Sequence, residues 1–241
     1  MLKIEKGAKK VPISLAIYGV EGVGKTTFAG ALPGALIVDV EKGSMNYDFL
    51  RITDIDGWNG LMNILRELYT NAAEYHKNGV KTIVFDSVDA IENSLLIPHI
   101  LENSKAQTLA EMEWGKGYEL ESRAFSTFLT ACAALKASSY NIAFIVHSTQ
   151  KEVNPPDTPP YSHYELKLNK KISAALKESV DMLLFFNFKI TVGSDKGMGK
   201  GKAAERVMVC NHTAYADAKN RFGLDTVLPM DVKLISEFME A

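Results

Sequence analysis

Cysteine is scarce in this chain of 241 residues, long apolar runs are missing, and positive charge is not in excess. Two cysteines, Cys132 and Cys210, are too few for a disulfide scaffold, which favours the reducing cytoplasm. No apolar run reaches the ~20 residues that span a membrane, and the charged N-terminus lacks the apolar stretch of a secretory signal, so we expect no membrane partner. The net charge of -2 excludes a general basic surface, so nucleic-acid binding must come from local patches or from oligomerisation.

Hydrophobic residues make up 46% of the chain and charged residues 23%, an ordinary balance for a globular protein with a substantial core. The length suits a single domain over residues 1–241, with a tail at 1–10. We expect mobile loops at 148–169 and 193–202, because the first is rich in proline and the second in glycine and lysine.

Short apolar runs alternate with segments of helical spacing along the chain. The expected strands cover 13–18, 35–40, 49–55, 82–85 and 142–146, and the expected helices cover 25–32, 58–76, 88–101, 118–137 and 170–178. Residues 182–192 and 206–210 are expected to form a late antiparallel hairpin. This order predicts an α/β fold with a mainly parallel, twisted sheet and helices on both faces. Ligands of such sheets bind beyond the carboxyl ends of the strands.

A phosphate-binding loop follows the first expected strand. The pattern G-x-x-x-x-G-K-[ST] is matched by Gly19, Val20, Glu21, Gly22, Val23, Gly24, Lys25 and Thr26, and Thr27 follows as a further expected nucleotide-binding residue. The glycines let the backbone turn its N–H groups toward phosphate oxygens, and the next helix adds its positive end. Lys25 can reach the β- and γ-phosphates and Thr26 can bind magnesium, so the loop predicts ATP and Mg²⁺ as ligands.

Asp86 ends the apolar strand expected at 82–85. A carboxylate at this place can hold magnesium through a water molecule, as a Walker B aspartate does. The alternative is a structural role, in which Asp86 and Ser87 cap the helix that follows.

Two further polar residues lie at strand ends. Glu41 could orient and polarise the water that attacks the γ-phosphate, and Asp39 competes for this role; the alternative is a solvated charge. His147 could donate a hydrogen bond to the γ-phosphate and report its presence to the segment behind it, unless it only caps its strand.

Taken in order, these elements resemble the RecA ATPase core. That family places a D-x-E strand end after the P-loop strand, matched here by Asp39-Val40-Glu41, and an Asp-Ser pair after a later strand, matched by Asp86-Ser87. The resemblance implies a RecA-like P-loop NTPase core in which Glu41 activates water. His147 stands where the family carries a phosphate-sensing glutamine.

A second match is the segment KNRFG, from Lys219 to Gly223, which resembles the motif of the RadA branch. By this resemblance, Lys219 and Arg221 act in trans, completing the nucleotide site of a neighbouring subunit in a homo-oligomer. The chain as a whole is most similar to the short RecA-like phage nucleotide-binding proteins of the Sak-four single-strand annealing type. This implies the host-cell cytoplasm and, as a further partner, a phage single-strand DNA-binding protein.

The RecA resemblance also implies two DNA-binding loops, here 103–117 and 148–169. The second carries a set of aromatic and basic residues that suits single-stranded DNA, since rings stack on bases and charges follow phosphates: Lys151, Tyr161, His163, Tyr164 and Lys167. A disordered proline-rich loop is the alternative. The lysines of a third loop, Lys196, Lys200 and Lys202, could also contact phosphates or belong to a solvated hairpin tip.

The sequence therefore predicts a RecA-like ATPase that couples ATP hydrolysis to single-stranded DNA binding in recombination or annealing. DNA and oligomerisation are expected to stimulate hydrolysis. One alternative is a nucleotide-gated binding or loading module with little catalysis. Another is a P-loop small-molecule kinase, which the few, scattered arginines disfavour.

Overall fold

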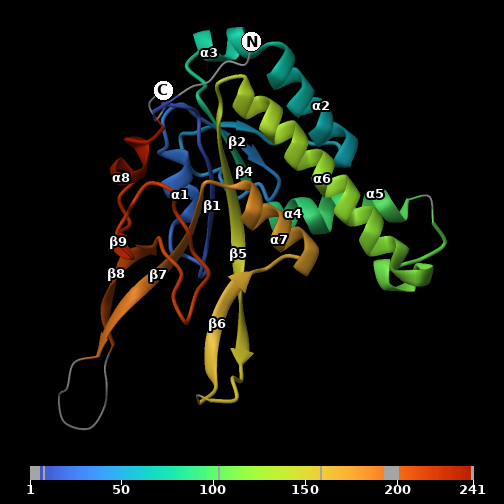
Figure 1. The fold of residues 1–241 in the computed structure, drawn as a ribbon. Helices are drawn as coiled ribbons and strands as arrows, with labels where there is room; N and C mark the ends of the chain where they lie inside the picture. The colour runs from blue at the N-terminus through green and yellow to red at the C-terminus, as the bar shows by residue number, and fades with distance from the viewer. Residues whose placement is uncertain (1–5, 8, 103, 158, 193–200, 240–241) are drawn as a thin grey trace.

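The computed structural model of the chain describes residues 6–7, 9–102, 104–157, 159–192 and 201–239. Its centre is a sheet of nine strands in the order β3-β2-β4-β5-β1-β7-β8-β9, with β6 paired to β5 outside this path (Figure 1). The strands are β1 (Ser14–Gly19), β2 (Ala35–Asp39), β3 (Leu50–Ile52), β4 (Thr82–Asp86), β5 (Asn141–Val153), β6 (Tyr161–Leu166), β7 (Met182–Val192), β8 (Gly201–Val209) and β9 (Val227–Pro229). The neighbouring strands along β3-β2-β4-β5-β1-β7 pair in parallel. The pairs β7-β8, β8-β9 and β5-β6 are antiparallel.

Helices cover both faces of the sheet. They are α1 (Lys25–Gly30), α2 (Gly57–Thr70), α3 (Ala72–Lys77), α4 (Val88–Ala90), the π-helical η1 (Ile91–Leu96), α5 (Ile97–Leu101), α6 (Lys116–Ala137), α7 (Lys170–Ser179) and α8 (Lys233–Ser236), with short 3₁₀ turns η2 (Leu109–Glu111) and η3 (Glu113–Gly115). In Figure 1, α2, α6 and α7 lie on one side of the sheet and α1 and α8 on the other.

The alternation of side chains along the central strand explains this layering. In β1, Ala16 and Tyr18 belong to the core beneath α2 and α6, whereas Leu15 and Ile17 belong to the core beneath α1. All six residues of β1 are buried, because a parallel strand with helices on both faces exposes neither side. The expected α/β fold, with its mainly parallel sheet and antiparallel C-terminal hairpin, is confirmed.

The segment 148–169, expected to be a loop, is mostly a β-hairpin. Strand β5 continues to Val153 and pairs with β6, from Ser148 opposite Leu166 to Val153 opposite Tyr161. The prolines that suggested a loop occupy only the connection between the two strands, where they do not remove ladder hydrogen bonds. This hairpin projects from the body of the protein below the central sheet in the view of Figure 1.

Other expected boundaries differ less. The helix expected at 58–76 is divided into α2 and α3 at Asn71, and the short elements β9 and α8 were not anticipated. The loop expected at 193–202 lies outside the described residues except for its last two, which begin β8, and most of the tail at 1–10 also lies outside them. No helix of the described residues combines the length and apolarity needed to cross a membrane.

The parallel strands bring their carboxyl ends to one edge of the sheet. Gly19 at the end of β1 is level with His147 of β5, and Asp39 at the end of β2 is level with Asp86 of β4. Residues distant in sequence are therefore neighbours at this edge, which is where α/β sheets bind ligands.

Candidate nucleotide-binding site

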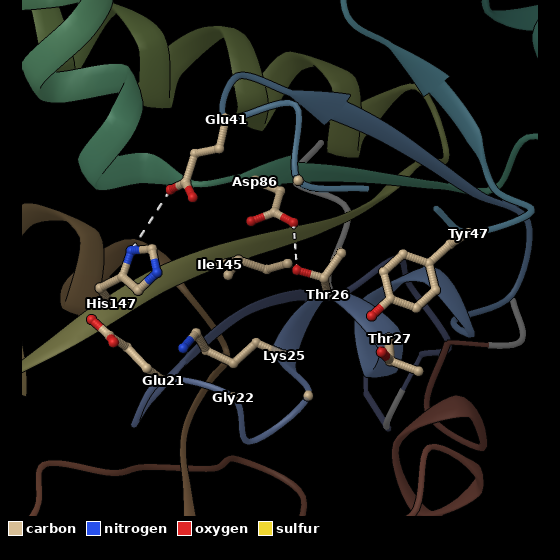
Figure 2. A pocket seen from close by; sticks show the side chains of 12 residues that line it. Glu21, Gly22, Lys25, Thr26, Thr27, Glu41, Tyr47, Asp86, Ile145 and His147 are labelled. Carbon is tan, nitrogen blue, oxygen red and sulfur yellow. Dashed lines mark hydrogen bonds and ion pairs between the residues drawn. The ribbon is translucent and has the colours of Figure 1, made fainter. Parts of the chain in front are cut away.

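The P-loop lies over the end of β1 and borders a cavity of about 240 Å³ (Figure 2). Position 19 requires glycine because the backbone of β7 passes close to it: a Cβ there would collide with the carbonyl oxygen of Phe186. Gly24, which precedes α1, has a φ of 101°, a left-handed conformation that glycine adopts without strain. The cavity is lined by Glu21, Gly22, Gly24, Lys25, Thr26, Thr27, Glu41, Gly43, Tyr47, Asp86, Ile145 and His147.

Lys25 points back into its own loop. Its Nζ donates hydrogen bonds to the carbonyl oxygens of Gly19, at 2.9 Å, and Val20, at 3.2 Å. Burial lowers the pKa of this ammonium group, while the carboxylates around the cavity, Asp86 first among them, act in the opposite direction. The charge is thus held at the floor of the cavity, where phosphate oxygens can replace the carbonyl partners.

Thr26 and Asp86 meet across the cavity. The Thr26 hydroxyl donates a 2.7 Å hydrogen bond to Oδ2 of Asp86 (Figure 2). Burial raises the pKa of Asp86 to about 6, although the hydrogen bond from Thr26 opposes the shift. A buried carboxylate beside a hydroxyl offers the hard oxygen ligands that Mg²⁺ prefers, so these two residues fit the ion. The helix cap is Ser87, whose Oγ accepts a hydrogen bond from the Ala90 N–H, so Asp86 is not used as a cap.

The two acidic residues at the end of β2 have different surroundings. Asp39 is fully buried and accepts hydrogen bonds from Gly43 N–H, Ser44 N–H and the Ser44 hydroxyl, so it folds the loop that follows β2. Glu41 lines the cavity, and its Oε1 accepts a short hydrogen bond from the Ser87 hydroxyl. Of these two carboxylates, only Glu41 is available to a ligand in the cavity.

His147 is fixed by Asp89, which the sequence analysis did not identify. Its Nδ1 lies 2.8 Å from Oδ2 of Asp89, and its backbone N–H donates to Oδ1 at 3.0 Å. The hydrogen bond to Asp89 raises the pKa of His147, whereas burial of the ring opposes this. Burial alone would raise the pKa of Asp89, but the hydrogen bonds from His147 lower it. The result is a pair that favours a charged imidazole at the cavity wall.

Glu41, Asp89 and His147 form one cluster. Oε1 of Glu41 lies 3.7 Å from Nδ1 of His147, and the ligand atoms of all three residues lie within 4.8 Å of one another. Such a set could hold a metal ion, but both oxygens of Asp89 already accept hydrogen bonds from His147. The cluster is therefore complete as a hydrogen-bonded unit.

Tyr47 is a second cavity residue that the sequence analysis missed. Its ring stacks on Phe49 with the centroids 5.2 Å apart, and the side chain remains 42% exposed beside the P-loop residue Thr27 (Figure 2). An exposed ring at this place can stack on a nucleotide base. The available signal was an aromatic residue shortly after Glu41 in the loop that follows β2.

Lys219 and Arg221 lie outside this cavity. The backbone of Lys219 pairs with Leu183 near the start of β7, and Arg221 forms a 3.1 Å ion pair with Asp181. The start of β7 is level with Leu15 at the start of β1, so these residues lie toward the opposite end of the sheet from the P-loop. They do not complete the cavity of their own chain.

The expected DNA-binding residues have unequal exposure. His163 is buried, with Nδ1 2.7 Å from the Ala214 carbonyl oxygen and Nε2 3.3 Å from Asp217. Tyr164 packs on Phe185 with centroids 4.8 Å apart, and Lys151 lies 3.9 Å from Glu165. Tyr161 is exposed at the end of the hairpin, and in the other segment Trp114 is 99% exposed. The buried ring of His163 serves to hold the hairpin and is not open to a ligand.

A family model described as an AAA domain matches residues 11–222, which is most of the chain. A comparison with curated proteins gave no match. The matched region contains the P-loop, the strand end with Asp86 and the histidine of β5. The mostly parallel sheet fits the same kind of P-loop NTPase core, whose members bind and hydrolyse nucleotides. The chain belongs to the AAA domain family of P-loop NTPases.

Proposed function

We propose that this chain is a RecA-like, magnesium-dependent ATPase that binds single-stranded DNA in homologous recombination or annealing. The observation that carries the ATPase part is the convergence of Lys25, the Thr26–Asp86 pair, Glu41 and His147 on one cavity. These residues come from four elements of the sheet edge. They supply phosphate binding, metal binding, a general base and a hydrogen-bond donor to the γ-phosphate.

Glu41 is the residue we assign to the attacking water. Ser87 donates a hydrogen bond to one carboxylate oxygen and fixes its orientation, and the side chain borders the cavity. A carboxylate so placed can accept a proton from water as the bond to the γ-phosphorus forms and the bond to the β–γ bridging oxygen breaks. Thr26 and Asp86 would hold Mg²⁺, which would neutralise charge on the phosphate oxygens.

We assign Lys219 and Arg221 to the nucleotide site of a neighbouring subunit in a homo-oligomer. Their distance from the cavity of their own chain is compatible with a role in trans, and Arg221 is accessible, with its side chain 65% exposed. A guanidinium supplied by a neighbour stabilises the charge that develops during phosphoryl transfer. A lone subunit should then hydrolyse ATP slowly.

The DNA-binding part is supported by two exposed features. Trp114 lies in the segment 103–117 with almost its whole surface open, and the β5–β6 hairpin carries Tyr161 near its tip. Exposed rings stack on unpaired bases without sequence preference. The hairpin balances lysines against glutamates, as the pairing of Lys151 with Glu165 illustrates, so we expect modest and salt-sensitive affinity. A phage single-strand DNA-binding protein is the further partner that we propose.

The decisive test is an ATPase assay with and without single-stranded DNA, run alongside a mass measurement of the assembly. We expect turnover that rises with DNA and with protein concentration. Fast turnover that is independent of both contradicts the coupling that we propose.

Glu41→Gln separates a hydrolase from a nucleotide-gated module. The substitution keeps the shape of the side chain and removes the base. We expect ATP binding to persist while hydrolysis and any DNA-dependent output that requires it are lost. A variant that keeps its DNA-dependent output in ATP supports the module instead.

A further inference from the structure

Arg206 of β8 brings a second cationic side chain to the P-loop from the C-terminal hairpin. It lies two residues before Met208, which belongs to the core beneath α1 together with Phe28. Residues two apart on a strand share a face, so Arg206 also projects toward α1. Arg206 pairs with Phe188 on β7. Phe188 lies two residues past Phe186, which is level with Gly19 at the carboxyl end of β1. The topology therefore directs Arg206 to the edge of the sheet that carries the P-loop.

The guanidinium reaches Gly24, the glycine immediately before Lys25. Nη1 of Arg206 lies 3.1 Å from the position that a Cβ on Gly24 would occupy, and the Met230 methyl group lies 3.3 Å from it. The Arg206 backbone carbonyl accepts a hydrogen bond from Met230 N–H, so the segment after β9 is fixed to the backbone of β8 at this residue. Any larger residue at position 24 would displace the arginine.

The charge of Arg206 has no ion-pair partner in the part of the chain that the structure describes. The Arg206 guanidinium makes no hydrogen bond or ion pair with a described residue. The neighbouring Glu205 pairs in register with Lys189 and projects from the opposite face of the strand. Arg206 therefore adds an exposed positive charge, unpaired among the described residues, beside the P-loop, where a phosphate oxygen can become its partner.

We propose that Arg206 binds the phosphate chain of the nucleotide held by the same subunit. A guanidinium presents several donors in a planar fork that matches phosphate oxygens, and it is more weakly hydrated than an ammonium group. The assignment rests on the proposed ATP-binding function and adds to it a contact made in cis. The C-terminal hairpin then takes part in nucleotide binding as well as in the sheet.

The test is the dissociation constant of a fluorescent ATP analogue for the wild-type chain and for Arg206→Ala, Arg206→Gln and Arg206→Lys. We expect Arg206→Ala and Arg206→Gln to bind about tenfold more weakly, as loss of one charged hydrogen bond predicts, and Arg206→Lys to retain part of the affinity. The affinity of the two uncharged variants should also depend less steeply on salt concentration. Arg206→Gln keeps most of the length of the side chain and so guards against a packing defect.

Lys189→Ala is the matched control, because it removes one positive charge from the same hairpin at a position that does not reach Gly24. We expect wild-type affinity for this control. Unchanged affinity in Arg206→Ala, or an equal loss in Lys189→Ala, overturns the proposal for Arg206 while ATP binding by the wild-type chain upholds the proposed function. Failure of the wild-type chain itself to bind ATP overturns both.

Discussion

Asp89 accepts two hydrogen bonds from His147, one from the backbone N–H at 3.0 Å and one from ring Nδ1 at 2.8 Å. A carboxylate can only accept, so Nδ1 must carry a proton. Nε2 is the remaining ring nitrogen available to the cavity, and it can donate to a phosphate oxygen only if it is protonated as well. A phosphate-sensing role for His147 therefore requires the imidazolium ion, and Asp89 is a positioning residue that favours this form.

Asp89→Asn tests this relationship through the pH dependence of hydrolysis. The asparagine keeps the shape of the contact but removes the charge that raises the pKa of His147. The charged form of a histidine is present below its pKa and is lost as the pH rises through it, so the alkaline loss of activity should move to lower pH. We expect kcat to fall by up to about tenfold on the alkaline side of the ordinary histidine pKa and to change little well below it.

The matched variant is His147→Gln, whose amide donates a hydrogen bond at any of these pH values. It should flatten the pH profile of kcat across this range. A profile that is the same in the wild type and in Asp89→Asn contradicts the role of Asp89, whereas a purely structural role would lower kcat equally at every pH.

Asp86→Asn should separate nucleotide binding from magnesium binding. The amide cannot supply a negative charge to the cation, but the P-loop amides and Lys25 remain. We expect the magnesium concentration for half-maximal hydrolysis to rise by about 10- to 100-fold, with ATP binding in the absence of magnesium close to the wild-type value. Magnesium titrations of hydrolysis and of nucleotide binding measure the two effects. An unchanged magnesium requirement contradicts the assignment of Asp86.

Tyr47→Ala should weaken the binding of ATP by about tenfold, because a stacked aromatic ring contributes roughly 1–3 kcal/mol per base. Tyr47→Phe keeps the ring and should bind like the wild type. Tyr69→Ala removes another exposed tyrosine, 53% open on α2, and serves as the control. Equilibrium binding of a fluorescent ATP analogue measures all three variants. Equal affinities of Tyr47→Ala and the control contradict stacking on this ring.

The parts of the site that sequence could predict are those encoded by contiguous residues. Gly19 to Thr26 form a local pattern, and Asp86 and His147 are marked by the apolar strands that precede them. The positions of Asp89 and Arg206 depend on how separate elements pack, so no local pattern marks them, and Tyr47 was marked only by its place shortly after Glu41. Asp39 competed with Glu41 for the role at the attacking water, and the hydrogen bonds of the β2–β3 loop show that Asp39 is occupied within the fold.

In the fold, too, local sequence patterns predicted some elements, whereas elements that depend on contacts between distant residues were missed. Buried parallel strands were predicted well, because each is a continuous apolar run between turn residues. The β5–β6 hairpin was missed because its strands are mostly polar, although Leu166 at the base of the hairpin is packed in the core. Its pairing depends on contacts such as that of His163 with Ala214 and Asp217, which are about fifty residues away in sequence.

Glu92 and Glu121 form a buried carboxyl pair away from the nucleotide cavity. Glu92 is on η1 and 4% exposed, and Glu121 is on α6 and 1% exposed. The Asn169 N–H donates to the Glu92 carboxyl group at 3.0 and 3.3 Å, at the point where the β5–β6 hairpin leads into α7. Burial raises the pKa of both groups, that of Glu92 to about 7, and the nearby Glu121 carboxyl group raises the pKa of Glu92 further. Because burial disfavours two negative charges at one place, the folded pair retains a proton more readily than the unfolded chain does.

Glu121→Gln should change how stability depends on pH. The folded pair keeps a proton that the unfolded chain loses near its ordinary pKa of 4.5, so the free energy of unfolding falls as the pH rises from there through about 7. Glutamine supplies a permanent donor to Glu92 without titrating, so the variant should be more stable than the wild type at about pH 8, by roughly 1 kcal/mol or 2–4 °C in Tm. Near pH 5 the advantage should disappear, because the wild-type pair is then protonated.

Thermal unfolding of both chains across this range measures the difference, with Glu119→Gln on the exposed face of α6 as the control. Stability curves that run parallel for Glu121→Gln and the wild type contradict a retained proton, because only a titrating pair in the folded state makes them diverge.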